Sequence, residues 1–280
     1  MPKFAPRARI ALAIATALPA AAGAQSIEWT ATPAASPGEV QLQIERNAPN
    51  ARNSHSSGVA AANLRGLDLA RDGDQRFTFS REAGAFDCTG AVRQRRGSGS
   101  CSFTPDARFS HGLARLGMAR PDARDSFTLT MIDAHLVTAQ ALTRFGGRPT
   151  LGEFVSLSVQ GATTAWLDDL AGAGQRDVKA GELVAYRVQG VTGGWLRALI
   201  AADPALAKAA AGEVVAMRIH GVQPLWVRGL ADAGYRNLSA NDLVAMRIHN
   251  VSPEFVRAAT AMGGKPSAHE LIAQRITGRR

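Results

Sequence analysis

Residues 237–257 read NLSANDLVAMRIHNVSPEFVR and belong to a unit of about 29 residues that recurs along the second half of the chain. The copies begin near residues 152, 181, 212, 241 and 269, and the last copy is shorter than the others. An aromatic residue stands at the same position of each full copy: Trp166, Trp195, Trp226 and Phe255. Periods of this length are typical of stacked helical units, in which neighbouring copies bury a continuous core.

The residues at the ends of each segment predict two short helices per copy. Ser239 opens a capping box that starts the first helix, and Asn250 suits the left-handed conformation that ends it. Ser252 and Pro253 then supply the N-cap and the first residue of the second helix. We expect the first helix to turn four apolar side chains inward: Leu243, Val244, Met246 and Ile248.

The recurrent aromatic residue is followed by apolar residues one and four positions later, as in Trp166, Leu167 and Leu170. This spacing places the three side chains on one edge of a helix. We therefore interpret the aromatic residues as the core within each repeat. A ladder of aromatic rings that stacks on a ligand is the alternative.

Arginine recurs at two positions of the unit, which predicts two basic rows along the array. The first row is Arg187, Arg218, Arg247 and Arg275, and the second row is Arg197, Arg228 and Arg257. Because such rows can engage an extended acidic partner, we identify six candidate partner-binding residues: Arg187, Arg197, Arg218, Arg228, Arg247 and Arg257. A solvated face, in which arginines pair with acids such as Glu182, is the alternative. The first copy carries Ser158 and Asp168 at these positions, so that end of the array differs.

The region from residue 25 to residue 104 predicts a small antiparallel β-domain. Val40, Leu42 and Ile44 alternate with polar residues, as in a strand with one buried face. Phe77 and Phe79 show the same alternation. Residues 47–58 are rich in Asn and Ser, and their composition is typical of a flexible connection.

Cys88 and Cys101 are the two cysteines of the chain, and a hairpin register predicts a disulfide between them. When the strands 84–90 and 99–105 pair with Cys88 opposite Cys101, the same register aligns two further pairs: Phe86 with Phe103 and Gly90 with Gly99. Directly opposed cysteines form a cross-strand disulfide readily in an oxidising compartment. A metal site or a redox pair is disfavoured, because neither further ligands nor C-x-x-C spacing accompanies the cysteines.

The first 24 residues predict a secretory signal peptide that is removed from the mature chain. Basic residues precede a short apolar run, and Ala22-Gly23-Ala24 is a small-x-small cleavage site. Cleavage lowers the formal charge from +9 to +6, because the segment carries three basic residues and no acid. We expect a periplasmic or secreted protein without a stable membrane anchor after cleavage, since no later segment has the roughly 18 apolar residues of a membrane helix.

These observations predict an α+β chain, with a small antiparallel β-domain followed by an array of short helix-pair repeats. We expect the disulfide-stapled β-domain at 25–104, a linker at 105–125 that is rich in Arg, Asp, Pro and Gly, and helical repeats at 126–280. We expect residues 126–145 to be helical and to form a degenerate capping copy of the repeat, because stacked arrays end in atypical units.

The motifs of the chain favour a function other than catalysis. His269-Glu270 resembles the start of H-E-x-x-H, but Ala273 replaces the second histidine. His220 and His249 recur once per repeat, which is typical of structural residues rather than of converging metal ligands. Nucleophile elbows, phosphate loops and dinucleotide-binding glycine patterns are missing from the sequence. We therefore expect no catalytic residues, no cofactor and no metal.

The repeat text of residues 237–257 resembles the short repeats in the C-terminal extensions of bacterial membrane metallopeptidases of the β-lactam-sensor type, and those of small secreted proteins. The blocks 79–86 and 97–103 are similar to the domain that precedes the repeats in such proteins. The resemblance covers most of the mature chain. It does not include the peptidase domain of those metallopeptidases, so it implies no catalytic chemistry. It implies an accessory or sensing role outside the cytoplasm.

We expect the protein to be an extracytoplasmic, non-enzymatic protein-interaction module whose partner is another envelope protein. The alternative is a binder of anionic polymer or lipid head groups through the arginine rows and the hairpin loop 93–96. That loop carries Arg93, Arg95 and Arg96, which also suit a solvated hairpin tip.

Overall fold

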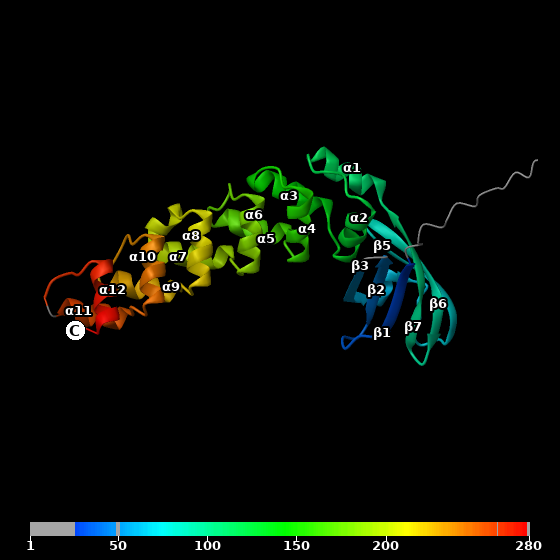
Figure 1. The fold of residues 1–280 in the computed structure, drawn as a ribbon, viewed down its shortest axis with the longest axis horizontal. Helices are drawn as coiled ribbons and strands as arrows, with labels where there is room; N and C mark the ends of the chain where they lie inside the picture. Colours follow the sequence, from blue (N-terminus) through cyan, green and yellow to red (C-terminus); the bar gives the residue numbers. More distant parts are fainter. Residues whose placement is uncertain (1–25, 49–50, 262, 279–280) are drawn as a thin grey trace, which may run out of the picture. The chain divides into compact units, whose positions relative to one another are not determined.

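In the computed structural model of the chain, the described residues are 26–48, 51–261 and 263–278. The predicted signal peptide, residues 1–24, lies outside these ranges. Seven antiparallel strands come first and helices follow, which confirms the predicted α+β class (Figure 1). Within the described ranges, no helix has the length and apolar character needed to cross a bilayer.

The strands form one sheet in the order β3-β2-β1-β7-β6-β5-β4. Their bounds are β1 (Ser26–Pro33), β2 (Glu39–Ala48), β3 (Ala51–Ala60), β4 (Leu64–Arg65), β5 (Gly73–Arg81), β6 (Gly84–Arg93) and β7 (Arg96–Pro105), with a short 3-10 turn (Ala61–Asn63) before β4. The alternating residues Val40, Leu42 and Ile44 are buried, as their pattern predicts.

The β6–β7 hairpin has the predicted register. Cys88 and Cys101 form a disulfide with their Cα atoms 4.0 Å apart. The rings of Phe86 and Phe103 lie with centroids 4.8 Å apart. A Cβ atom added to Gly90 would lie 2.8 Å from the Cα atom of Gly99, so only glycine fits where these strands face each other. The three aligned pairs therefore belong to one register.

The ring of Trp29 in β1 packs against β7 and requires glycine at two positions of that strand. Its indole ring lies so close to Gly97 and Gly99 that a Cβ atom on either residue would approach the ring within 2.8 Å. The indole N–H donates a hydrogen bond to the carbonyl oxygen of Thr89, at 3.1 Å. The glycines thus leave a flat surface on which a large, fully buried ring packs.

The predicted flexible connection at 47–58 is wrong, because most of this segment is strand β3, which pairs with β2. The amide of Gln41 donates a hydrogen bond to Ser56 Oγ at 2.7 Å, and that of Gln43 donates to Ser54 Oγ at 3.0 Å. The polar residues that resemble a loop in the sequence therefore form cross-strand pairs on an edge strand.

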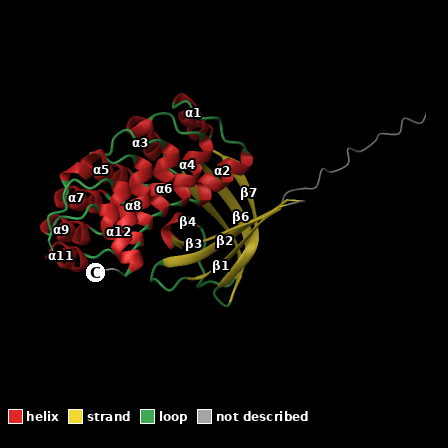
Figure 2. Ribbon diagram, turned by 60° about the vertical axis from the view of Figure 1, so that its left-hand side comes forward, coloured by secondary structure: helices red, strands yellow, loops and turns green. Residues whose placement is uncertain are grey.

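The helices form two rows, visible side by side in Figure 2. The A row contains α2 (Ala123–Met131), α4 (Leu151–Val159), α6 (Ala180–Val188), α8 (Ala211–Ile219), α10 (Ala240–Ile248) and α12 (Ala268–Thr277). The B row contains α1 (Ala107–Arg115), α3 (Leu136–Gly146), α5 (Thr164–Gly172), α7 (Gly193–Ala202), α9 (Pro224–Asp232) and α11 (Pro253–Ala261). Each helix contacts the next helix of its own row, as in a solenoid.

The predicted helix ends are confirmed. Side chains and N–H groups form reciprocal capping boxes at Thr150, Ser239 and Ser267. Gly221 and Asn250 adopt positive φ angles of 68° and 52°, so the A helices end in the left-handed conformation. The second copy departs after α7, where the buried carboxylate of Asp203 caps the 3-10 turn Pro204–Lys208 and also accepts a hydrogen bond from the N–H of Asn237, at 2.7 Å.

The segment 105–125, predicted as a linker, contains helix α1 and the start of α2. Asp106 and Asp122 are N-caps whose carboxylates accept hydrogen bonds from the first N–H groups of these helices. Phe109 and Leu113 lie one turn apart on α1 and are buried. The charged composition that resembles a linker therefore belongs to capped helices with one buried face.

The segment 126–145, predicted to be helical, consists of most of α2 and α3, and these two helices form the degenerate first copy. Asp133 has a φ angle of 55° and occupies the helix-ending position that Gly161 occupies one copy later, at 69°. Thr138 stands where Trp166 stands in the next copy, and both residues are buried. The internal turn was hidden because aspartate rather than glycine adopts the left-handed conformation.

The described residues divide into two compact units, and the division does not fall at residue 104. One unit comprises the described residues up to Ala62 with Gly66–Arg76 and Cys88–Cys101, and the other comprises Asn63–Arg65, Phe77–Asp87 and the chain from Ser102 onward. In the second unit, the ring of Phe127 in α2 meets those of Phe86 and Phe103 edge to face. These three phenylalanines therefore form one aromatic cluster that joins β6, β7 and α2.

Replacement of both Cys88 and Cys101 by serine should lower the free energy of unfolding by about 3 kcal/mol, because the disulfide restricts the unfolded chain. Urea unfolding followed by circular dichroism measures the change. Wild-type protein in reductant should match the double variant. Equal stability with and without reductant would contradict a stabilising role for the disulfide.

Candidate interaction surface of the helical repeats

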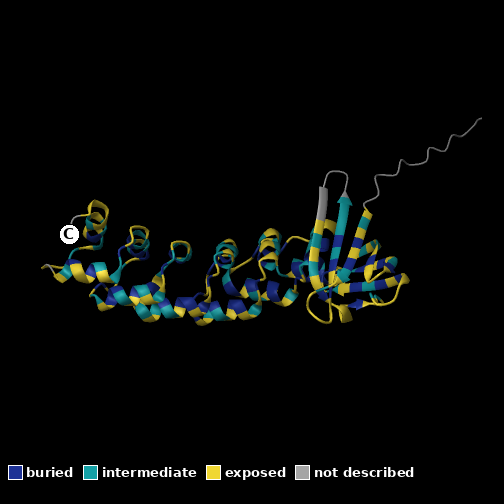
Figure 3. Ribbon diagram, turned by 90° about the horizontal axis from the view of Figure 1, so that it is seen from below, coloured by how far each residue is buried: buried dark blue, intermediate teal, exposed yellow. Residues whose placement is uncertain are grey.

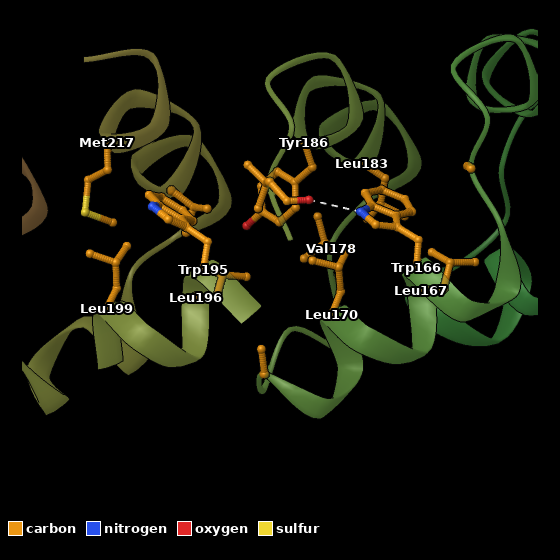
Figure 4. Packing of buried hydrophobic residues seen from close by; sticks show 14 of the residues in the cluster. Trp166, Leu167, Leu170, Val178, Leu183, Tyr186, Trp195, Leu196, Leu199 and Met217 are labelled. Carbon is orange, nitrogen blue, oxygen red and sulfur yellow. Dashed lines mark hydrogen bonds between the residues drawn. The ribbon is translucent and has the colours of Figure 1, made fainter. Parts of the chain in front are cut away.

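Trp166 and Trp195 are buried in the core between the two rows, as predicted, whereas Trp226 and Phe255 are partly buried and pack against this core. Figure 4 shows Trp166 and Trp195 pointing from the B helices toward Leu183, Tyr186 and Met217 of the A helices. The indole N–H of Trp166 donates to the carbonyl oxygen of Val191 in the next copy at 3.0 Å. The indole N–H of Trp195 is also buried, and it has no hydrogen-bond partner in the described structure.

The first arginine row fastens each copy to the preceding one. Arg187 donates hydrogen bonds to the carbonyl oxygens of Gln160 and Gly161, at 2.8 and 2.9 Å, where helix α4 ends. Its guanidinium carbon lies 5.5 Å from the centroid of the Trp166 ring. The same stacking recurs for Arg218 over Trp195, Arg247 over Trp226 and Arg275 over Phe255. The carbonyl contact recurs for Arg218 and Arg247.

This contact satisfies carbonyl groups that a helix end leaves unpaired and adds a cation–π interaction. Of the six candidate partner-binding residues, Arg187, Arg218 and Arg247 are therefore held within the array, and their charge lies in the valleys between A helices. The sequence carries a signal for this role, because each aromatic residue is followed in the next copy by an arginine of the first row. Where Thr138 replaces the aromatic residue, Ser158 replaces the arginine in the next copy.

Arg81 replaces the missing arginine at the first copy. Its guanidinium donates to the carbonyl oxygens of Thr130 and Met131 at the end of α2, and it lies 3.4 Å from the carboxylate of Asp133. Burial lowers the pKa of Arg81, and the carboxylate of Asp133 opposes this shift. Sequence reasoning missed this residue because Arg81 is distant in sequence from α2 and ends strand β5, outside the repeats.

The second arginine row is exposed and lies on the B helices. Arg197 forms an ion pair with Asp169 at 2.8 Å, and Arg257 forms one with Glu254 at 2.9 Å. Arg228 has no ion pair with any described residue. The structure thus leaves separate, mostly paired charges here rather than a continuous basic row.

An aliphatic row crosses the outer side of the A helices. Its members are the last residue or the last but one of successive A helices, and each is 52–64% exposed: Val159, Val188, Ile219, Ile248 and Ile276. The predicted inward orientation of Ile248 is therefore wrong. Leu243 and Met246 are buried as predicted, and Val244 is partly buried against the core. Ile248 lies five positions after Leu243 and two after Met246, which turns it to the opposite side of the helix.

Three further positions complete this surface on each A helix, and they precede the member of the aliphatic row by seven, four and three residues in α8. In α8 they are Gly212, Val215 and Ala216, followed by Ile219 of the aliphatic row. The equivalents of Val215 are Val155, Val184, Val244 and Ile272. The equivalents of Ala216 are Ser156, Ala185, Ala245 and Ala273. We call this surface of small and aliphatic residues the A face. Figure 3 shows exposed residues alternating with buried ones along these helices.

Opposite charges border the A face. Carboxylates lie at the starts of the A helices, where they accept hydrogen bonds from the capping N–H groups: Glu153, Glu182, Glu213, Asp242 and Glu270. The first arginine row lies near the ends of the same helices. The carboxylates at the helix starts and the arginines near the helix ends both complement the helix dipole. The A face therefore has one acidic border and one basic border.

The remaining predicted residues are not members of the A face. His220 and His249 are exposed C-caps of α8 and α10. Arg93, Arg95 and Arg96 are exposed at the β6–β7 turn, whose Gln94 N–H donates to the carboxylate of Asp72 at 3.0 Å. Within the described ranges, no three His, Cys, Asp or Glu residues come together as a possible metal-binding group.

Replacement of Arg187 by methionine should lower the free energy of unfolding by about 1–2 kcal/mol, because it removes two carbonyl contacts and a cation–π interaction. Methionine keeps much of the aliphatic stem. The matched control is Arg228→Met on an exposed helix surface, which should change stability by less than about 0.5 kcal/mol. Urea unfolding measures both variants, and equal effects would contradict a stapling role.

Asp169→Asn should flatten the dependence of stability on acid pH. The Arg197 side chain and the N–H groups of Gly193 and Gly194 lower the pKa of Asp169. A lowered folded pKa means that the stabilisation is complete above the ordinary aspartate pKa of about 3.9 and is lost as pH falls through the folded value. Thermal unfolding between about pH 6 and pH 2.5 should show a steeper loss in wild type, and parallel curves would argue against this coupling.

No protein-family model, curated protein or solved structure matches the chain. The resemblance to the extensions of β-lactam-sensor-type metallopeptidases therefore stays a prediction from the repeat text.

Proposed function

We propose that the chain is an extracytoplasmic, non-enzymatic protein-interaction module, with an accessory or sensing role, that binds another envelope protein through the A face. The observation that carries this proposal is the aliphatic row, in which five β-branched side chains at repeat pitch are each more than half exposed. Contiguous exposed apolar surface of this kind marks interaction sites. The disulfide and the predicted signal peptide support a location outside the cytoplasm.

Binding to an anionic polymer or to lipid head groups has less support. Arg187, Arg218 and Arg247 already contact carbonyl oxygens and aromatic rings, and the A face also has an acidic border. Carboxylates along a surface oppose the approach of a polyanion. The exposed arginines at the β6–β7 turn and on the B helices remain the sites that such a ligand would use.

Site-specific photo-crosslinking in the native host tests the proposal. A crosslinking amino acid replaces Ser156 on the A face or, as the control, Asp168, which is exposed on α5 of the B row. Position 156 should yield a discrete protein adduct that is weaker or missing at position 168. The adduct should be lost in the variant Ile219→Glu, Ile248→Glu.

The matched control for this variant is Leu225→Glu, since Leu225 is a large apolar residue that is 79% exposed on α9, away from the A face. It should keep the adduct. Adducts at position 168 alone, or an adduct that survives the A-face variant, would overturn the assignment of the A face. Specific binding to an anionic polymer that disappears with added salt would support the alternative instead.

A further inference from the structure

The geometry points to a single amphipathic α-helix, contributed by the partner, as the element that occupies the A face. This inference rests on the proposed function and specifies the partner of the same surface. The partner helix lies across the A helices, along the direction in which they stack. Its apolar side chains face the aliphatic row, its acidic flank faces the basic border, and its basic flank faces the acidic border.

The width of the A face fits one helix. The face extends over seven residues of each A helix, for example from Gly212 to Ile219, which corresponds to roughly 10 Å at 1.5 Å per residue. An α-helix with its side chains is about 10–12 Å across. A β-sheet or a globular surface would extend beyond the apolar strip and cover the charged borders.

The length and pitch of the A face also fit a helix. Five consecutive A helices, α4 to α12, carry the aliphatic row. Packed helices lie about 8–10 Å apart, so the row extends over roughly 32–40 Å. About 25 helical residues cover this length, and seven residues of helix advance roughly 10.5 Å. One apolar stripe with a seven-residue repeat therefore meets successive members of the row.

The surface is open enough to admit side chains. A Cβ atom added to Gly152 or Gly212 would meet no atom within 4 Å. These glycines lie on the A face seven residues before Val159 and Ile219, so α4 and α8 each present a protruding aliphatic side chain at one end and a shallow position at the other. Such a surface accepts ridges from a partner helix.

The two charged borders select the flanks of the partner helix. The carboxylate of Glu153 lies beside α6, because a Cβ atom on Gly181 would be 3.3 Å from its Oε1 atom. The guanidinium of Arg187 lies at the other end of the same valley, over Trp166. A helix with one sign of charge on both flanks would be attracted at one border and repelled at the other.

Peptide binding to the purified chain from residue 25 onward tests the inference. The probes are labelled 25-residue peptides with a Leu stripe at spacings of three and four residues. One carries Glu on one flank and Lys on the other, and two controls carry Lys on both flanks or Glu on both flanks. A fourth peptide has the composition of the first in scrambled order. Fluorescence anisotropy gives the Kd, and circular dichroism gives the helix content on binding.

The mixed-flank peptide should bind as a helix, at least about tenfold more tightly than the three controls. Ile219→Glu, Ile248→Glu should weaken its binding by at least about tenfold, because two apolar contacts are lost, whereas Leu225→Glu should leave the Kd unchanged. Unaltered thermal unfolding of the variants excludes misfolding as the cause. Tightest binding of the all-Glu peptide, or mixed-flank binding that survives the A-face variant, would overturn the inference.

The peptide assay and the crosslinking experiment fail independently. An A-face adduct in cells, with weak binding of all helical peptides, would leave the proposed function standing and overturn only the helical occupant. An adduct between two copies of the chain would instead overturn both the envelope-protein partner and the helical occupant, and would identify the occupant as a second copy. Loss of both signals would overturn the function and the inference together.

Discussion

The array depends on the contact between an arginine of one copy and the aromatic ring and helix end of the copy before it. A helix of nine residues leaves carbonyl groups unpaired at its end, and a single copy buries too little apolar surface to be stable alone. Arg187 resolves both problems at once, since its guanidinium satisfies the end of α4 while it covers the ring of Trp166. Because stacking supplies the missing contacts, the copies are stable only in series.

Local chemistry made much of the fold predictable. The caps at Thr150 and Ser239, the helix-ending position of Asn250 and the register that joins Cys88 to Cys101 depend on neighbouring residues or on one hairpin. The errors arose where composition misled. The residues of β3 and α1 resemble connections, but their polar side chains pair across strands or cap helices.

The candidate surface was less predictable, because a repeat pattern shows which residues recur but not the direction in which their side chains point. Arginine at a fixed position indicated a basic binding row, yet the side chain of Arg218 turns between copies and contacts Trp195. Ile248 lies in an apolar stretch of the sequence and is predicted to face the core, yet its position at the end of a nine-residue helix turns it outward. When the whole helix is small and apolar, the side that faces solvent is decided by the neighbouring helices, which the period alone does not specify.

Arg81 makes the start of the array different in kind from its interior. It binds carbonyl oxygens at the end of α2, as Arg187, Arg218 and Arg247 do at later junctions, and it comes from the end of strand β5. The interior copies therefore share one arginine–aromatic contact, whereas the first copy is held by a residue of a strand. Lineages that gain or lose whole copies between Trp166 and Phe255 would change the length of the A face in steps while keeping both ends intact.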